Sequence, residues 1–527
     1  MNRGIDQVFE RRLAGLINSR ERGVMSGGRK GVEKESLRVT PEGRLAQTTH
    51  PEALGSTLTN EFITTDYSEA LIELVTPTFT ESWELLQFLC DLHQFVYRHL
   101  GDELLWATSM PSNISGDAEI PIARYGRSNI GRMKEVYRTG LGHRYGRMMQ
   151  AISGVHFNYS FPDHFWTVLA AILETGDDQA FRSDRYFALL RNYRRYGWLV
   201  LYLFGNSPCA SDSFISNLHR EHTLRHFTRD TWYEPYATSL RMSDLGYRNK
   251  SQAHVSISVN SIDEYIRDLS RLIAVPSAEY QRIGVKVDGE YKQLNANVLQ
   301  IENEYYSFIR PKRVGRSGER PTQALKRGGV EYVEVRALDV SAFDPVGVNQ
   351  NKLRFLEAFL ALCVLKDSPP IEAAEEEVLD NNHIVVAHRG REPGLMLNRN
   401  GRAAAMHHWA LELLDSMQGI CEMLDQNSRQ KPYAAALEIQ RAKVLNVALT
   451  PSARTITELN ATGQSFAEFA LDMSVSHKAY FLDLYPPNER RLEEFRVEAE
   501  ESLRRREAIE AADKTGFEEF LAQYFAT

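Results

Sequence analysis

The stretch Gly31-Val32-Glu33-Lys34-Glu35-Ser36-Leu37-Arg38-Val39 predicts a β-strand, because apolar residues recur along it and Pro41 closes it. Side chains alternate between the two faces of a strand, so Glu33 and Glu35 lie on one face, about 7 Å apart, together with Leu37. A carboxylate on an inward face is costly unless it is paired or bound to a metal. Taken alone, the pattern is more typical of two exposed strand glutamates. Other segments must therefore decide between exposed glutamates and an inward pair that binds a metal or a cation.

Composition places the chain among ordinary water-soluble globular proteins. Its 527 residues are 43% hydrophobic and 25% charged, and the formal net charge of −8 argues against a general nucleic-acid binder. Residues 1–18 lack the apolar core of a signal peptide, and no apolar stretch is long enough to span a membrane, which predicts a cytoplasmic protein. The cysteines are far apart in the chain, so free thiols are expected at Cys90, Cys209, Cys363 and Cys421.

Strand-like segments precede residue 345 and helix-like segments dominate after it, which predicts an α+β fold. We expect residues 1–370 to form a sheet region with helical insertions. Residues 371–527 would form a mostly helical region packed on it, or both would belong to one large domain. Residues 205–250 are expected to be loop-rich, and residues 367–400 to be the loosest join. The apolar spacing predicts helices at 81–100, 129–152, 178–204, 262–275, 352–366, 402–425, 433–446, 464–473 and 487–512.

Carboxylates recur on several other predicted strands, and one histidine lies within an apolar strand. The groups are Asp66 with Glu73, Glu302 with Glu304 on a predicted strand at 297–308, Glu334 with Arg336, and His156. A ligand set rich in oxygen and poor in cysteine suits Mg²⁺ or Mn²⁺. A histidine in an apolar strand is more often a hydrogen-bonded core residue than a ligand, so the metal site is a hypothesis at this point.

A cationic stretch, Arg310-Pro311-Lys312-Arg313-Val314-Gly315-Arg316-Ser317-Gly318, lies between two of the carboxylate-bearing strands and is expected to be a loop. Neither GxxxxGK[ST] nor GxGxxG occurs in the chain, which argues against a P-loop enzyme. Cations beside metal-binding carboxylates are what phosphoryl transfer needs, because they offset transition-state charge. The cationic stretch could instead be an ordinary solvated basic loop. Two other kinds of candidate residue also have a structural alternative: Arg241 could form a structural ion pair, and Tyr137, Tyr247 and Tyr306 could be core aromatics.

At these residues the chain resembles bacterial glutamate–cysteine ligases of the gamma-proteobacterial type. The blocks that carry the resemblance cover about residues 26–365 in order: 31–39, 50–55, 63–67, 152–156, 243–247, 299–304, 309–313 and 331–336. The resemblance implies a fold related to the glutamine synthetase catalytic domain, an antiparallel sheet that forms a funnel-shaped active site. It also implies that ATP drives the joining of the L-glutamate γ-carboxyl to the L-cysteine amine, through a γ-glutamyl phosphate, in the first step of glutathione biosynthesis.

The resemblance also implies roles for single residues. Two or three Mg²⁺ ions, or Mn²⁺, would be held by Glu33, Glu35, Asp66, Glu73, His156 and Glu334. ATP and its transferring phosphoryl group would be held by Arg310, Lys312 and Arg336, with Glu334 in the catalytic set. Arg241 would bind the glutamate α-carboxylate. The cysteine pocket would be lined by Tyr67, Tyr137, Leu141, Gln150, Tyr247 and Tyr306, and Tyr67 stands where phenylalanine is expected.

Two other functions stay open at this stage. One is a related carboxylate–amine ligase with a different amine acceptor, and the other is a catalytically inactive metabolite-binding relative. Every carboxylate that the site needs is present, which argues against the inactive relative. Glutathione is expected as a feedback inhibitor, because it would overlap both amino-acid sites, and neither a nucleic acid nor a membrane is expected as a partner. The sequence leaves open whether the chain acts as a monomer.

Overall fold

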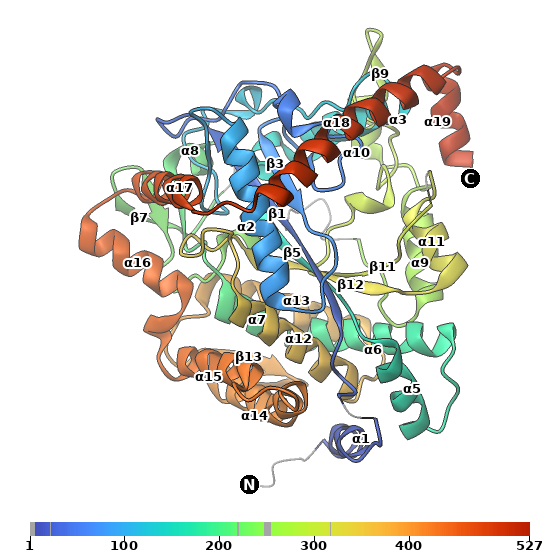
Figure 1. The fold of residues 1–527 in the computed structure, drawn as a ribbon, viewed down its shortest axis with the longest axis vertical. Coiled ribbons are helices and arrows are strands. Elements are labelled where there is room, and N and C mark those ends of the chain that lie inside the picture. Colours follow the sequence, from blue (N-terminus) through green and yellow to red (C-terminus); the bar gives the residue numbers. More distant parts are fainter. Residues whose placement is uncertain (1–5, 22, 219–220, 247–254, 317, 527) are drawn as a thin grey trace.

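A seven-stranded antiparallel sheet forms the centre of the computed structural model, which describes residues 6–21, 23–218, 221–246, 255–316 and 318–526 (Figure 1). The strand order is β11-β12-β5-β1-β3-β2, and β4 pairs with β1. The strands are β1 (Arg29–Val39), β2 (Ile63–Thr65), β3 (Leu71–Val75), β4 (Leu104–Leu105), β5 (Gly154–Ser160), β11 (Ile309–Lys312) and β12 (Tyr332–Asp339). Every pairing in this sheet is antiparallel and helices surround it, so the α+β prediction is confirmed.

One face of this sheet is buried against helices. Val32, Phe157 and Val335 stand directly opposite one another on β1, β5 and β12, and all three are fully buried. The helices that complete this apolar core are α2 (Ser82–His99), α6 (Gln179–Tyr196), α7 (Trp198–Phe204) and α12 (Gln350–Leu365). Because side chains alternate along a strand, the residues next to this apolar row point to the other face of the sheet.

The insertions between the central strands are helices and short hairpins. Residues 205–250, expected to be loop-rich, contain a small three-stranded sheet in the order β6-β8-β7. These elements are α1 (Gln7–Ile17), α3 (Asn129–Tyr145), α4 (Arg147–Gln150), α5 (Asp163–Ile172), β6 (Cys209–Ser211), α8 (Asp212–Ser216), β7 (Arg225–Thr228), β8 (Thr231–Tyr233), α9 (Ile262–Leu272), α10 (Ala278–Ile283), β9 (Lys286–Val287), β10 (Glu290–Tyr291) and α11 (Pro321–Gly328).

The chain after residue 370 is mostly helical, as expected, but two local predictions are wrong. Residues 367–400 are not a loose join, because they include the 17-residue helix α13. The helix expected at 402–425 begins only at Met406, after a hairpin of β13 and β14. The elements are α13 (Ala373–Arg389), β13 (Met396–Arg399), β14 (Arg402–Ala405), α14 (Met406–Leu424), α15 (Pro432–Leu445), α16 (Pro451–Thr462), α17 (Phe466–Asp483), α18 (Glu489–Ala512) and α19 (Phe517–Ala526).

The predicted single helix over 129–152 is also wrong, because it is broken at Gly146. This residue has a φ of 82°, a backbone conformation that residues with a side chain rarely adopt. Gly146 thereby ends α3 and turns the chain into the short helix α4. The break places Leu141 and Gln150, both expected in the acceptor pocket, on two different helices.

The C-terminal helices pack against the N-terminal part of the chain. Helices α17 and α18 contact α2, α19 contacts α3, and α14 contacts α1 (Figure 1). A hydrogen bond joins the two parts: the Tyr433 hydroxyl of α15 donates at 2.7 Å to Glu357 Oε2, which also pairs with Lys30 Nζ at 2.8 Å. A division into two units near residue 370 stays a prediction.

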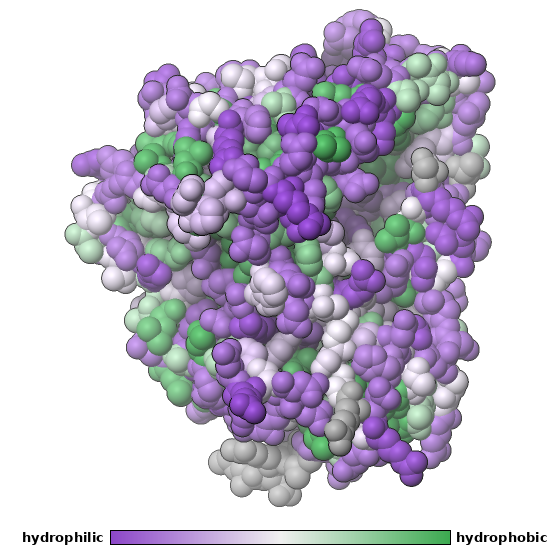
Figure 2. All heavy atoms as spheres, viewed as in Figure 1, coloured by the Kyte–Doolittle hydropathy of each residue, from purple (hydrophilic) through white to green (hydrophobic). Residues whose placement is uncertain are grey.

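The surface seen in Figure 2 is mostly hydrophilic, with hydrophobic residues in small scattered groups. Large contiguous apolar patches usually mark interfaces with proteins or membranes, and none stands out on this face. Among the residues that the structure describes, no helix combines the length and the apolar character needed to cross a membrane.

Candidate active site

The register of the central sheet brings the predicted ligands to one face. Glu33 on β1 stands opposite His156 on β5, and Glu35 stands opposite Glu73 on β3. On the other side of β5, Asn158 stands opposite Glu334 on β12. Directly opposed residues of antiparallel strands project to the same face, so four neighbouring strands contribute to one charged surface.

His156 lies at the centre of this surface. Its Nδ1 atom is 3.0 Å from Glu33 Oε2 and 3.7 Å from Glu334 Oε1, and its Nε2 atom is 3.6 Å from Glu35 Oε1. Ligand atoms of Glu33, Glu73 and His156 all lie within 4.8 Å of one another. Three such atoms at this separation can bind one divalent cation with small side-chain movements.

Burial and mutual repulsion set the ionisation of these carboxyl groups. The pKa of Glu73 is raised well above its ordinary value, first by burial and then by the charges of Glu33, Asp66 and Glu35. Burial also raises the pKa of Glu35. For Glu33, burial would raise the pKa, but the hydrogen bond with His156 and the charges of His156 and Lys312 together lower it. The β3 side of the surface therefore disfavours the ionised form of its carboxyl groups, and for Glu73 the charge of Arg336 offsets this only in part.

Cations surround the carboxylate at the β12 end. Glu334 Oε1 is 3.1 Å from Arg336 Nη1, and Glu334 Oε2 is 3.7 Å from Lys312 Nζ. Burial would raise the pKa of Glu334, but Lys312 and Arg336 outweigh it and hold that pKa well below its usual range. The oxygen Glu334 Oε2 is buried and accepts no hydrogen bond from the described residues. Arg310 stands opposite Glu334 on β11, and burial followed by the charge of Arg336 lowers its pKa.

The stretch Arg310–Gly318, predicted to be a loop, begins as strand β11, and this changes what its cations can reach. Arg310 and Lys312 alternate with Pro311 along the strand, so both project to the charged face. The Arg310 Nη2 atom also donates to the carbonyl oxygen of Asn303 at 3.1 Å.

The strand predicted around Glu302 and Glu304 is wrong, because these residues form a 3₁₀ turn at Glu302–Glu304. Glu302 Oε1 accepts from Arg320 Nε at 3.0 Å and from Thr322 Oγ1 at 2.7 Å. Glu304 Oε1 pairs with Arg144 Nη1 at 2.8 Å, and both side chains are fully buried. Both glutamates are therefore occupied by structural partners away from the carboxylate surface.

Asp66 lies in the turn between β2 and β3 and is half-buried. Its charge contributes to the raised pKa of both Glu35 and Glu73, so its carboxylate faces the same surface. Its carbonyl oxygen accepts hydrogen bonds from Arg138 Nε and, at 3.0 Å, from the Tyr125 hydroxyl, which hold the turn in place.

Arg241 is almost fully buried beside the β12 end of the surface. Its Nη2 atom donates to the Arg336 carbonyl oxygen at 3.1 Å, and its Nη1 atom donates to Met242 Sδ at 3.0 Å and lies 3.8 Å from Asp339 Oδ1. The hydroxyl of Tyr306 also contacts Met242 Sδ, at 3.2 Å. Arg241 and Tyr306, separated by 65 positions in the sequence, are therefore neighbours through one methionine.

The other residues predicted for the acceptor pocket are partly brought together. Tyr67 and Leu141 are buried in one apolar cluster, and Tyr137 packs against it. The Tyr67 hydroxyl is buried and has no hydrogen-bond partner among the described residues. Gln150 is half-buried at the end of α4. Tyr247 lies outside the described residues, and the roles of all these residues stay predictions.

Two residues of the site were missed by sequence reasoning. Asn158 Nδ2 donates to Glu33 Oε1 at 2.8 Å, and its position two residues after His156 on a strand was a signal that could have found it. Asp339 is fully buried and accepts from the hydroxyls of Ser207 and Ser239 at 2.7 and 2.9 Å. These two serines lie at least 100 positions away from Asp339, so no local pattern pointed to it.

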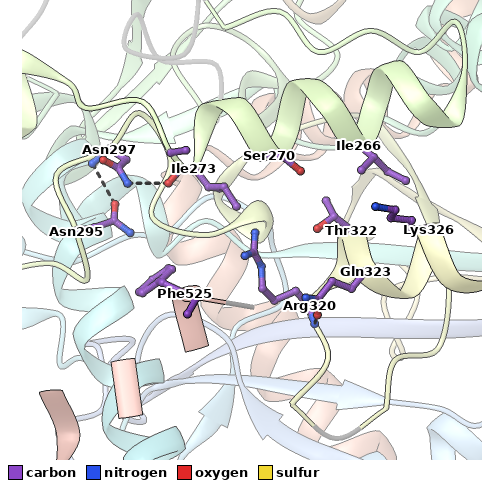
Figure 3. Close-up of a pocket in the computed structure, with 12 residues that line it drawn as sticks. Ile266, Ser270, Ile273, Asn295, Asn297, Arg320, Thr322, Gln323, Lys326 and Phe525 are labelled. Carbon is purple, nitrogen blue, oxygen red and sulfur yellow. Dashed lines mark hydrogen bonds between the residues drawn. The ribbon is translucent and has the colours of Figure 1, made fainter. Parts of the chain in front are cut away.

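A cavity of about 640 Å³ lies elsewhere, between α9, α11 and the end of α19 (Figure 3). Its polar lining includes Arg320 and Lys326, and Phe525 lies at one side of it. None of the carboxylates on the central sheet lines this cavity. The chemistry of the chain is therefore better sought at the carboxylate surface than at this cavity.

Comparisons with known proteins agree with this geometry. A family model described as glutamate-cysteine ligase matches residues 13–386. A glutamate–cysteine ligase of Alcanivorax borkumensis is 47% identical over 98% of this chain and 99% of its own length. The chain belongs to the glutamate–cysteine ligase family. A member from Pseudomonas putida is also 47% identical, over 94% of each chain.

Solved structures agree with the family and the fold. The crystal structure of a glutamate–cysteine ligase from Francisella tularensis, in complex with AMP, matches with a TM-score of 0.89 at 37% identity, over 95% of this chain and 98% of that chain. A bifunctional glutathione synthetase from Pasteurella multocida matches with a TM-score of 0.69 at 20% identity, over 91% of this chain and 55% of that chain, and shows the fold alone. Family membership thus covers almost the whole chain, including the C-terminal helices that follow residue 386.

Proposed function

We propose that this chain uses ATP to join the γ-carboxyl group of L-glutamate to the amine of L-cysteine, which gives γ-glutamylcysteine. The observation that carries the proposal is the convergence of Glu33, Glu73 and His156 within 4.8 Å, beside Glu334 and Arg336, in a chain of the glutamate–cysteine ligase family. The AMP bound to the Francisella tularensis enzyme supports ATP as the co-substrate. The product is the precursor formed in the first step of glutathione biosynthesis.

Phosphorylation makes the reaction possible because a carboxylate has no good leaving group. A γ-carboxylate oxygen of glutamate attacks the γ-phosphorus of ATP, the bond from this phosphorus to the β-phosphate oxygen breaks, and ADP leaves. The cysteine nitrogen then attacks the acyl carbon of γ-glutamyl phosphate, phosphate leaves, and the nitrogen loses a proton. One difficult substitution thus becomes two accessible steps, as in covalent catalysis.

The donor set fits Mg²⁺ or Mn²⁺ on two observations. Carboxylate oxygens dominate it, and the buried Glu334 Oε2 accepts no hydrogen bond from the described residues. We propose that two or three such ions bind to Glu33, Glu35, Asp66, Glu73, His156 and Glu334. When bound, they offset the negative charge of the triphosphate.

Arg336, Arg310 and Lys312 would bind the transferring phosphoryl group. Their charges lie around Glu334, which pairs with Arg336 at 3.1 Å and holds its guanidinium in place. Burial lowers the pKa of Arg336, but Glu334 and the other acidic groups around it together outweigh burial and raise the pKa, so this cation stays charged throughout the reaction. A fixed cation of this kind stabilises the charge that develops on the phosphoryl oxygens without reorganising at the moment of reaction.

The two amino-acid substrates would both bind beside the phosphoryl group. Arg241 would hold the glutamate α-carboxylate with its planar guanidinium. The cysteine side chain would lie among Tyr67, Tyr137, Leu141, Gln150, Tyr247 and Tyr306. The cluster formed by Tyr67 and Leu141 supports an apolar surface for a thiol.

The test is the dependence of ADP release on both amino acids. Purified protein with ATP and Mg²⁺ is expected to release ADP only when glutamate and cysteine are both present, and mass spectrometry should show γ-glutamylcysteine. A panel of other amines tests the alternative acceptor. ADP release that does not depend on cysteine would show that another amine is the substrate, and no release with any amine would favour the inactive relative.

We also propose an inhibitor, a cellular location and an assembly state for this chain. Glutathione would inhibit by competing with glutamate, because it carries the groups of both amino-acid substrates. The reaction would take place in the cytoplasm, a reducing compartment that suits the four free cysteines. The chain would act without a nucleic-acid or membrane partner, and a monomer is the simplest assembly to test by sedimentation.

A further inference from the structure

His388, near the C-terminal end of α13, bridges two carboxylates. Its Nδ1 atom is 2.6 Å from Glu234 Oε2, and its Nε2 atom is 2.6 Å from Asp244 Oδ1. Ionised carboxylates only accept hydrogen bonds, so both ring nitrogens must donate and the ring is an imidazolium. Burial disfavours this charge, but the hydrogen bonds to Asp244 and Glu234 outweigh it and raise the pKa of His388 to about 9.

The two carboxylates bracket the segment that carries Arg241. Glu234 directly follows β8, and Asp244 follows the 3₁₀ turn at Leu240–Met242. Between them, the backbone amides of Thr238 and Ser239 donate to the Ala387 carbonyl oxygen at 2.8 and 3.2 Å. The last turn of α13 therefore contacts the middle of this segment through Ala387, and His388 contacts the two ends of the segment at Glu234 and Asp244.

The position of Asp244 is coupled to that of Arg241 by a tight turn. The Gly246 amide donates to the Ser243 carbonyl oxygen at 3.1 Å. A Cβ atom at Gly246 would lie only 1.9 Å from the Arg241 carbonyl oxygen. The backbone of this turn is thus in close contact with Arg241, and a displacement of Asp244 must move it.

We infer that His388 is a positioning residue for glutamate binding: it holds Glu234 and Asp244 together and thereby fixes the turn from which Arg241 projects. The inference rests on the proposed role of Arg241. Two nearby arginines have other partners, because Arg391 Nε donates to the Ala237 carbonyl oxygen and Arg389 pairs with Glu392. Among the described residues, His388 therefore supplies the cation that contacts both carboxylates.

The experiment compares His388→Gln with His407→Gln, a matched change at an exposed histidine of α14. At pH 7.5, His388→Gln is expected to raise KM for glutamate about tenfold with a much smaller change in kcat and in KM for ATP. The ratio of its KM to that of the unmodified protein should fall toward one above pH 9, because the unmodified protein then loses its imidazolium. Ionisation of the substrates cancels in this ratio. His407→Gln should match the unmodified protein at every pH.

Asp244→Asn is the second variant, because the Asp244 side chain is 58% exposed and the change is mild. It should raise KM for glutamate with the same pH trend, and combining it with His388→Gln should add little. Unchanged KM in these variants, or a KM ratio that does not vary with pH, overturns the inference. Arg241→Lys separates the two claims: a raised KM there beside an unchanged KM in His388→Gln refutes only the positioning role, whereas an unchanged KM in Arg241→Lys refutes the proposed glutamate site.

Discussion

Removal of the Glu73 charge should raise the stability of the metal-free protein and weaken its binding of metal ions. Its pKa is raised by burial and by the charges of Glu33, Asp66 and Glu35, so the metal-free site is repulsive. Glu73→Gln keeps the size of the side chain and removes one of these charges. We expect the variant to be more stable than the unmodified protein in EDTA and less stabilised by Mg²⁺.

The magnitude follows from the geometry of the site. Two unit charges 4.8 Å apart repel by about 3 kcal/mol at an effective dielectric constant of about 20. Asn158 and His156 offset part of the Glu33 charge through hydrogen bonds of 2.8 and 3.0 Å. A net gain of about 1–2 kcal/mol in metal-free stability is therefore expected for Glu73→Gln.

The pH dependence has a definite sign. A carboxyl group whose pKa is raised in the folded state destabilises the protein only at pH values at which the group ionises in the unfolded chain. For Glu73 the destabilisation is absent below its ordinary pKa of 4.5, grows as the pH rises, and is complete above the raised pKa. The advantage of Glu73→Gln in EDTA should therefore grow from pH 4.5 upward.

Urea unfolding followed by tryptophan fluorescence measures these differences, with Glu422→Gln, a change at an exposed glutamate of α14, as the matched control. In EDTA at pH 7.5, Glu73→Gln should unfold at higher urea concentration than both other proteins. Mg²⁺ at about 100 times its dissociation constant should stabilise the unmodified protein by about 2.7 kcal/mol, and the variant by less. If Glu73→Gln is less stable in EDTA and gains as much from Mg²⁺, the assignment of Glu73 as a metal ligand is refuted.

Three further changes test other parts of the site and fold. Arg336→Lys should lower kcat for ADP release by about 10²–10³-fold, and a rate near that of the unmodified protein would contradict its phosphoryl role. Glu357→Gln leaves the buried ammonium of Lys30 without its ionic partner and should cost about 3 kcal/mol in urea unfolding. Gly246→Ala should raise KM for glutamate, because the new Cβ would clash with a backbone oxygen at 1.9 Å, whereas Gly176→Ala, with nothing within 4 Å, should leave it unchanged.

Strand alternation predicted the face shared by Glu33 and Glu35, but it could not distinguish segments that form strands from segments with the same alternation that do not. Glu33 and Glu35 share a face of β1, as their spacing required. The same spacing at Glu302 and Glu304 predicted a strand that does not form, because Arg144 and the residues around Thr322 bind these carboxylates in a turn. The two segments differ in their long-range partners, and a local sequence pattern carries no information about such partners.

Two other features depend on contacts that only the fold supplies. Strand β12 has an irregular register between Val335 and Leu338, where one extra residue faces β5. Such bulges re-aim a side chain, and Arg336 lies within this one, so its direction could not be predicted from alternation. Helix α13 was predicted as a loose join because of its acidic start, yet its far end supports the Arg241 segment through Ala387.

The order of the strands also arranges charge across the site. At the β3 side the pKa of Glu73 is raised by burial and then by neighbouring anions, whereas at the β12 side Lys312 and Arg336 lower the pKa of Glu334 despite its burial. A metal-bound triphosphate carries both signs, so its cations should bind toward β3 and its terminal phosphoryl group toward β12. Arg241 donates to the Arg336 carbonyl oxygen at 3.1 Å, at the same end. A glutamate held by Arg241 would therefore place its γ-carboxylate beside the phosphoryl group, and this alignment follows from the strand order together with the packing of the Leu240–Met242 turn against β12.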